Sequence, residues 1–134
     1  MLSGFFIIIS DRVLLMRKEF RIKKGDEIEL LIKKGFSKAN RTFIVYKMKN
    51  PLIDNYRIAI SAPKKLGNAV VRNRVKRQIR AILQQNSKVL ATGYDYFIIA
   101  RPDILEIDFV TMTNQIHHIM RLVHQAPPKR GKKL

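Results

Sequence analysis

The chain has 134 residues, enough for one domain with its own core, and 46% of them are apolar. It carries 27 lysines and arginines against 10 acidic residues, a formal net charge of +17. A compact domain with this surplus repels itself unless a polyanion binds it, so nucleic acid is the first expected partner and an anionic membrane surface the second. The absence of cysteine excludes a disulfide framework, a thiolate zinc site and a cysteine nucleophile, and it fits a reducing cytoplasm.

Residues 1–16 are expected to form an extension outside the domain. The apolar run at 5–9 is followed by Asp11 and Arg12, so it is too short for a membrane span, and it lacks the basic opening and cleavage site of a signal peptide. Two interpretations stay open, a poorly packed extension or a true start at Met16. The second is favoured because the basic, helix-forming character begins directly after Met16, and the residues before it should then be dispensable.

Periodicity and breakers predict six elements in the domain. They are a helix over 26–34, strands over 42–48 and 57–62, a helix over 67–85, a strand over 94–100 and a last helix after an Asp108 N-cap. The long helical crossover between the second and third strands predicts that these two strands are parallel. The expected fold is an α+β sandwich of order α-β-β-α-β-α, with room for one further strand before the second helix. The basic tail over 125–134 should be mobile.

The helix over 67–85 has an apolar face and a basic face. Its apolar arc holds Val71, Val75, Ile79, Ile82 and Leu83. The stretch from Arg57 to Arg80 contains eight basic residues and no acidic one. Arg72, Lys76 and Arg80 repeat at i+4, where like charges repel, and Arg72 also lies at the unfavourable end of the helix dipole. Both penalties disappear when phosphates bind, so the sequence predicts an RNA or DNA interface rather than a solvated charged face.

The residues from Lys64 to Arg80, KKLGNAVVRNRVKRQIR, closely resemble the signature of the bacterial ribonuclease P protein family. That family carries an Arg-Asn-Arg motif at the start of a long helix, after Lys-Lys and Gly-Asn-Ala-Val. The resemblance extends to residues 21–24, 39–43 and 99–101. It covers about residues 17–124, so we expect one RNA-binding domain over that range.

The resemblance implies a helper to a catalytic RNA. Members of the family bind a large RNA subunit that removes the 5′ leader from precursor tRNA, with Mg²⁺ held chiefly by the RNA and no catalytic residue in the protein. The implied fold is a ribosomal S5 domain 2-like α/β sandwich with a left-handed crossover, where general rules favour a right-handed one. The residues expected to contact RNA are Lys64, Lys65, Arg72, Asn73, Arg74, Lys76, Arg77 and Arg80.

The resemblance also implies a cleft between the first helix and the sheet that holds the single-stranded leader. Tyr46 matches an aromatic strand position that can stack on a base, and an ordinary half-buried strand tyrosine is an equal alternative. Ile28 and Ile32 stand where many relatives carry phenylalanines on the first helix. Aliphatic side chains offer a base no stacking ring, so leader contact should be weaker or should rest more on Tyr46 and on cations.

No independent active site is expected in the protein. His117, His118 and His124 share the last helix, but adjacent histidines project about 100° apart and no nearby carboxylate completes a metal site. Ser61 has no histidine or acid in register for a nucleophilic triad. Two other functions stay open: a ribosomal or other structural RNA-binding protein without a role in cleavage, and a membrane-surface protein, which the charge break near the N-terminus disfavours.

Overall fold

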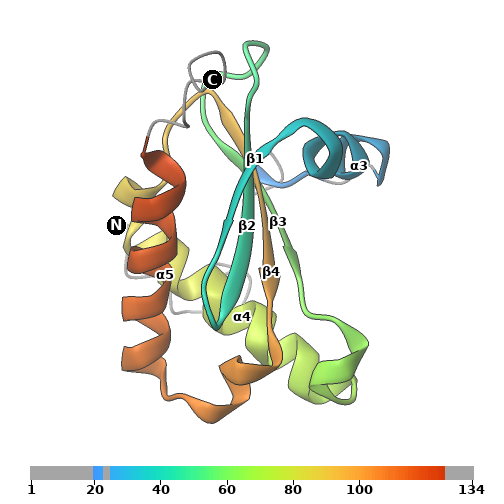
Figure 1. Ribbon diagram of the computed structural model, residues 1–134, viewed down its shortest axis with the longest axis vertical. Coiled ribbons are helices and arrows are strands. Elements are labelled where there is room, and N and C mark those ends of the chain that lie inside the picture. The colour runs from blue at the N-terminus through green and yellow to red at the C-terminus, as the bar shows by residue number, and fades with distance from the viewer. Residues whose placement is uncertain (1–19, 23–24, 126–134) are drawn as a thin grey trace, which may run out of the picture.

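The computed structural model describes residues 20–22 and 25–125, which form one sheet with helices on both faces (Figure 1). The helices are α3 (Gly25–Lys34), α4 (Ala69–Gln85) and α5 (Phe109–His124), and the strands are β1 (Phe36–Ala39), β2 (Phe43–Lys49), β3 (Arg57–Ser61) and β4 (Tyr94–Ala100). Short 3₁₀ turns cover Lys64–Leu66, Ser87–Val89 and Pro102–Glu106. The expected N-terminal extension, and all of the basic tail except its first residue, lie outside the described residues.

The sheet has the strand order β1-β2-β4-β3. Strand β2 pairs antiparallel with both β1 and β4, whereas β3 runs parallel to β4. The parallel pair confirms the expectation from the helical crossover, since α4 connects β3 to β4. The additional strand is β1, and it precedes the two strands predicted in this half of the chain. The left hand of the crossover stays a prediction.

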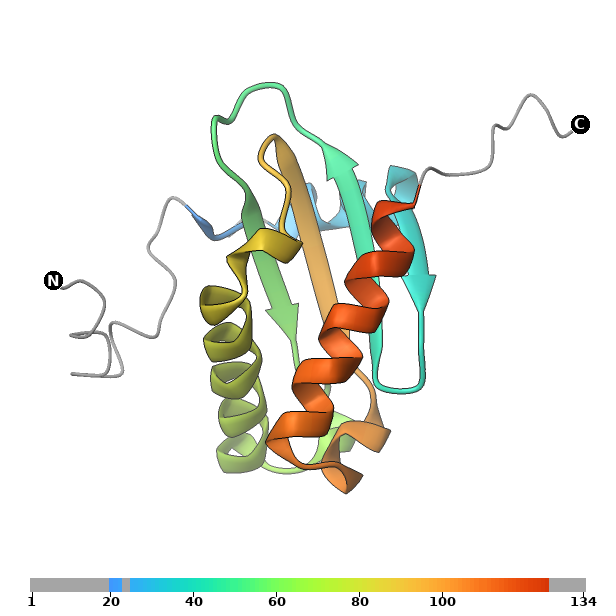
Figure 2. The same ribbon diagram turned by 90° about the vertical axis from the view of Figure 1, so that its left-hand side faces the viewer.

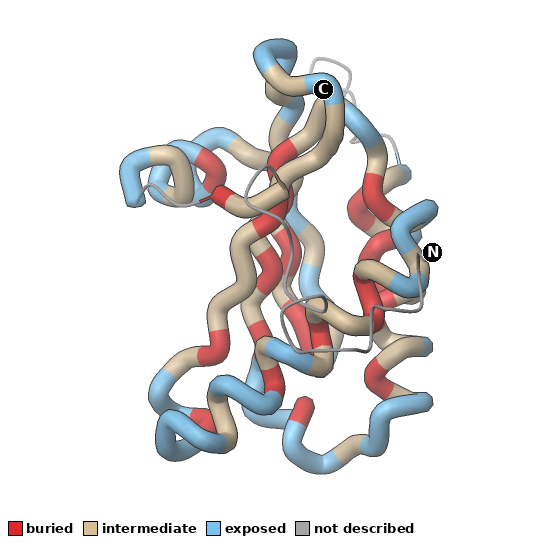
Figure 3. Tube along the Cα trace, turned by 180° about the vertical axis from the view of Figure 1, so that it is seen from behind, coloured by how far each residue is buried: buried red, intermediate tan, exposed pale blue. Residues whose placement is uncertain are grey.

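Helices α4 and α5 lie over one face of the sheet, and the core fills the space between them and the strands (Figure 2, Figure 3). Phe43 and Tyr96 are the largest fully buried side chains of the strands. Four of the five apolar residues expected on the core face of α4 are buried, whereas Val71 in its first turn is only partly buried. The Asp108 cap is confirmed, because its carboxylate accepts a hydrogen bond from the Thr111 N–H at 2.8 Å.

The opposite face of the sheet, here called the open face, is covered by α3 at one end (Figure 1). Strand alternation places on it the side chains of Ile44, Tyr46 and Met48 from β2, Ala59 and Ser61 from β3, and Asp95, Phe97 and Ile99 from β4. Of the described helices, α5 lies on the other side of the sheet and α4 reaches the open face only at the edge formed by β3, where three of its side chains line the same pocket as Phe97, so most of this face is not covered by a helix. None of the described helices is long and apolar enough to span a membrane.

Arg57 of β3 pairs with a buried carboxylate of β4 and with a more exposed one of α3. Asp95, which is 4% exposed, accepts hydrogen bonds from Arg57 Nε and Nη2, both at 2.9 Å, and from Asn50 Nδ2 at 3.1 Å. The same Nη2 atom lies 3.5 Å from a carboxylate oxygen of Glu27 on α3. The hydrogen bond to Asp95 raises the pKa of Arg57, and the two carboxylates neutralise its charge. Arg57 therefore stabilises the fold, although in the sequence it is the first residue of the basic stretch that ends at Arg80.

Tyr96 makes the stability of the fold sensitive to alkaline pH. Its hydroxyl accepts a hydrogen bond from the Ala91 N–H at 2.8 Å, and burial raises its pKa to about 12 from an ordinary value of 10.0. The unfolded chain loses the phenolic proton first, so this contribution is complete below pH 10 and declines as pH rises through 12. We expect wild type to lose about 2–3 kcal/mol more than Tyr96→Phe over that interval, measured by urea unfolding. If the free energies of unfolding of the two proteins declined equally between pH 10 and 12, this prediction would be contradicted.

Candidate nucleic-acid interface

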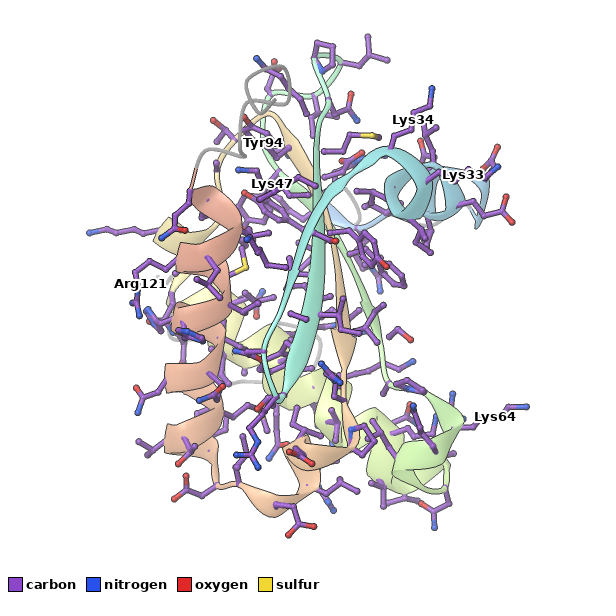
Figure 4. All side chains as sticks on the ribbon, in the orientation of Figure 1. Lys33, Lys34, Lys47, Lys64, Tyr94 and Arg121 are labelled. Atoms are coloured by element: carbon purple, nitrogen blue, oxygen red, sulfur yellow. The ribbon has the colours of Figure 1, made fainter. Side chains whose placement is uncertain are left out.

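Helix α4 begins where its sequence supplies a turn and a cap. Gly67 has a φ of 140°, a backbone conformation that favours glycine, and the Asn68 side chain accepts a hydrogen bond from the Val71 N–H at 3.0 Å. Directly before this turn, Lys64 and Lys65 are exposed, and Figure 4 shows Lys64 projecting away from the fold. The two lysines therefore stand beside the first turn of the basic helix.

The basic side of α4 divides into two stripes. The outer stripe consists of Asn73, Arg74 and Arg77, which are exposed. The inner stripe consists of Arg72, Lys76 and Arg80, which are spaced one turn apart and are partly buried. The helix contains no acidic residue, so neither stripe is neutralised from within α4. The eight residues expected to contact RNA thus lie on one helix and the turn before it, at two different depths.

A recess of about 580 Å³ lies between the inner stripe, β3, α3 and the segment 20–22. Its lining combines four cations, Arg21, Arg72, Lys76 and Arg80, with apolar side chains that include Ile28 of α3 and Phe97 of β4. No carboxylate is among the described residues that line it. Single-stranded nucleic acid needs both surfaces, because cations follow its phosphates and apolar or aromatic groups meet its bases.

The cations of the recess repel one another. Burial lowers the pKa of Arg80, and the charges of Arg21 and Arg77 lower it further. Arg72 Nε donates a hydrogen bond to the Ala62 carbonyl at 2.8 Å, which holds the guanidinium against the end of β3. The buried Nε of Arg21 has no hydrogen-bond partner among the described residues. A phosphate in the recess would relieve this repulsion and accept charge-assisted hydrogen bonds.

The three residues expected in the leader cleft occupy different places. Ile28 lines the recess, whereas Ile32, one turn further along α3, is 45% exposed and is not part of that lining. Tyr46 lies on the open face opposite Phe97, with ring centroids 6.2 Å apart and ring planes 27° from parallel. The structure therefore brings Ile28 together with the inner stripe and Tyr46 together with a second ring, rather than all three into one pocket.

Two residues of this surface escape sequence reasoning. Arg21 reaches the recess because the Ile22 N–H donates to the Ile58 carbonyl at 3.0 Å, which joins this short segment to the edge of β3. Phe97 belongs to an almost uniformly apolar strand, so its sequence does not show which side chains face away from the core. The one available signal is Asp95, a polar residue two positions earlier and hence on the same face.

The histidines of α5 take part in packing contacts with different neighbours. His117 Nε2 lies 3.1 Å from Asn86 Oδ1, His118 Nδ1 lies 3.2 Å from Asn40 Nδ2, and His124 Nε2 lies 2.6 Å from the Val89 carbonyl oxygen. They do not converge on one point. In the part of the chain that the structure describes, no three His, Asp or Glu side chains are grouped so as to hold a metal ion.

Comparison with known sequences points to one family. The family model named Ribonuclease P matches residues 16–124. A ribonuclease P protein component of Bacillus pumilus is 39% identical over 118 residues, which are 87% of this chain and 99% of that protein. One from Bacillus cereus is 41% identical over 118 residues, which are 88% of this chain and 100% of that protein. The match therefore spans essentially the full length of these relatives.

Solved structures agree with the sequence comparison. The ribonuclease P protein of Staphylococcus aureus has a TM-score of 0.73 at 37% identity, covering 78% of this chain and 95% of that one. That of Thermotoga maritima has a TM-score of 0.70 at 28% identity, covering 78% of this chain and 98% of that one. The resemblance seen around the Arg-Asn-Arg helix is thus confirmed in sequence and in fold, and the chain belongs to the ribonuclease P protein family.

Proposed function

We propose that this chain is the protein subunit of ribonuclease P, which binds a catalytic RNA and the 5′ leader of precursor tRNA and assists endonucleolytic removal of that leader in the cytoplasm. The observation that carries the proposal is the recess in which cations of α4 meet apolar side chains of α3 and β4, with no carboxylate among the described residues of its lining. Membership of the family supports it, since the relatives are ribonuclease P protein components.

The two stripes of α4 suggest how the contacts are divided. In this proposal the outer stripe, with Lys64 and Lys65, binds phosphates of the catalytic RNA, because these side chains are exposed and need no rearrangement. The inner stripe binds RNA phosphates inside the recess, on the side of α4 that is nearer to α3. Ile28, Ile32 and Tyr46 then meet bases of the leader, which extends from the recess across the open face.

Mg²⁺ is assigned to the RNA subunit in this proposal. A divalent cation prefers carboxylate and phosphate oxygens, whereas the described lining of the recess offers four cationic side chains and no carboxylate. The residues of this surface therefore do not fit a bound Mg²⁺. Their chemistry is to bind and orient RNA, while cleavage of the phosphodiester belongs to the RNA.

Reconstitution with RNA tests the proposal. We expect the chain to stimulate cleavage of a precursor tRNA by a bacterial ribonuclease P RNA at low Mg²⁺, where RNA alone is slow. The protein purified free of RNA should not cleave, because the described residues offer no group of His, Asp and Glu side chains that could hold a metal ion. Tight RNA binding with no gain in cleavage rate would favour the alternative, a structural RNA-binding protein. Robust cleavage by the protein alone would refute the assignment of catalysis to RNA.

A further inference from the structure

The open face carries an aromatic pair formed by two neighbouring strands. Phe97 of β4 lies opposite Tyr46 of β2, and their rings are stacked at a centroid distance of 6.2 Å. On the other side of Phe97 the opposite residue is Ala59 of β3, whose methyl group is too small to cover a ring. Phe97 is accordingly only partly buried, and it is the aromatic residue that lines the recess.

Helix α3 supplies no ring to this surface. Its ten residues, GDEIELLIKK, include no aromatic side chain, and only Ile28 contributes to the recess lining. Stacking of a base on an aromatic ring is stronger than contact with an aliphatic group and tolerates any base sequence. Among the described residues that line the recess, the aromatic ring therefore comes from the sheet and not from the helix.

We propose that Phe97 is the residue on which a base of the single-stranded leader stacks, with Tyr46 extending the same surface to an adjacent base. This inference rests on the proposed function and adds a specificity-determining residue to it. The base lies between Phe97 and Ile28, and its flanking phosphates lie against the cations that line the same recess. Leader recognition thus depends on strand β4, because α3 lacks the ring.

Affinity measurements with the reconstituted holoenzyme test this role. Phe97→Leu keeps an apolar side chain and removes the ring, so we expect the ratio of affinities for leader-bearing precursor tRNA and mature tRNA to fall about tenfold. Binding of mature tRNA should be unchanged. Tyr94→Leu is the matched control, because Tyr94 lies on the same strand but faces the other side, where the Lys47 ammonium sits 4.6 Å from its ring centroid (Figure 4). Tyr94→Leu should leave the ratio as in wild type.

Two further readouts separate stacking from a loss of folding. A leader made of abasic nucleotides should weaken binding by the wild-type holoenzyme more than binding by Phe97→Leu, since the variant has already lost one of the base contacts. A leader containing 4-thiouridine, irradiated on the wild-type holoenzyme, should crosslink to the peptide that contains Phe97, and this measurement needs no variant.

The outcomes distinguish this inference from the proposed function. An unchanged affinity ratio in Phe97→Leu, equal weakening for both substrates, or crosslinks confined to α3 would overturn the role of Phe97. A wild-type holoenzyme that shows no preference for leader-bearing substrate and no stimulation of cleavage would instead refute the proposed function itself.

Discussion

Replacing Asp95 with alanine is expected to lower the free energy of unfolding by about 3 kcal/mol. The carboxylate is 4% exposed and accepts two hydrogen bonds from Arg57 and one from Asn50. Its removal leaves the Arg57 guanidinium in a largely buried site, with Glu27 at 3.5 Å as the carboxylate still beside it. An uncompensated buried charge is the expensive part of breaking such a pair. Urea unfolding monitored by circular dichroism measures the loss.

Asp103→Ala is the matched control for this prediction. Asp103 also pairs with an arginine, Arg41 at 3.3 Å, but both side chains are largely exposed. An exposed pair contributes little because water screens it, so we expect a change of less than about 0.5 kcal/mol. Equal losses in the two variants would mean that burial of Asp95 does not determine the strength of its pair.

A fourfold increase in salt concentration is expected to weaken binding of the RNA subunit about 250- to 1000-fold. Seven cations lie on α4 and the turn before it, and engagement of about six phosphates predicts that log affinity falls against log salt with a slope of about −4 to −5. Each bound phosphate releases condensed counterions, and added salt opposes that release. Filter binding or fluorescence anisotropy at several salt concentrations gives the slope.

The outer stripe provides variants for the salt experiment. Arg74→Ala combined with Arg77→Ala should reduce the magnitude of the slope by about 1.5, since two phosphate contacts are lost. Lys88→Ala is the control, because Lys88 is exposed and lies beyond the opposite end of α4, far from the Arg-Asn-Arg motif. A slope near zero, or the same slope in all three proteins, would contradict a phosphate interface on this helix.

The position of helix α4, and the side of it that faces the core, could be predicted because two sequence patterns coincide there. The 3.6-residue repeat of Val75, Ile79 and Ile82 and the basic opposite arc describe the same helix, although the expected start at residue 67 lies two residues before the observed one. Strand β1 could not, because its four residues, FSKA, are too few and too polar to show an alternating pattern. It forms because antiparallel pairing with β2 satisfies its backbone.

The site is less visible in the sequence because its geometry depends on distant contacts. Arg57 looks like one more basic residue until Asp95, 38 positions away, is placed against it. Ile28 and Ile32 have the same residue type, and only packing of α3 on the sheet separates the one that lines the recess from the exposed one. Local pattern thus identifies the basic helix, whereas the recess beside it requires the tertiary fold.

The hydrogen bond from Arg72 Nε to the Ala62 carbonyl has a consequence for the kinetics of RNA binding. An arginine that moves freely in the unbound protein loses rotamer entropy when a phosphate fixes it, at a cost of about 0.5–1.5 kcal/mol. Arg72 incurs most of that cost during folding, and its planar guanidinium already presents the remaining donors in one direction. A lysine could carry the same charge but could not be held and aimed in this way. The first residue of the inner stripe is therefore preorganised for phosphate binding. Preorganisation of this kind slows dissociation of the bound RNA, whereas charge alone mainly speeds its association.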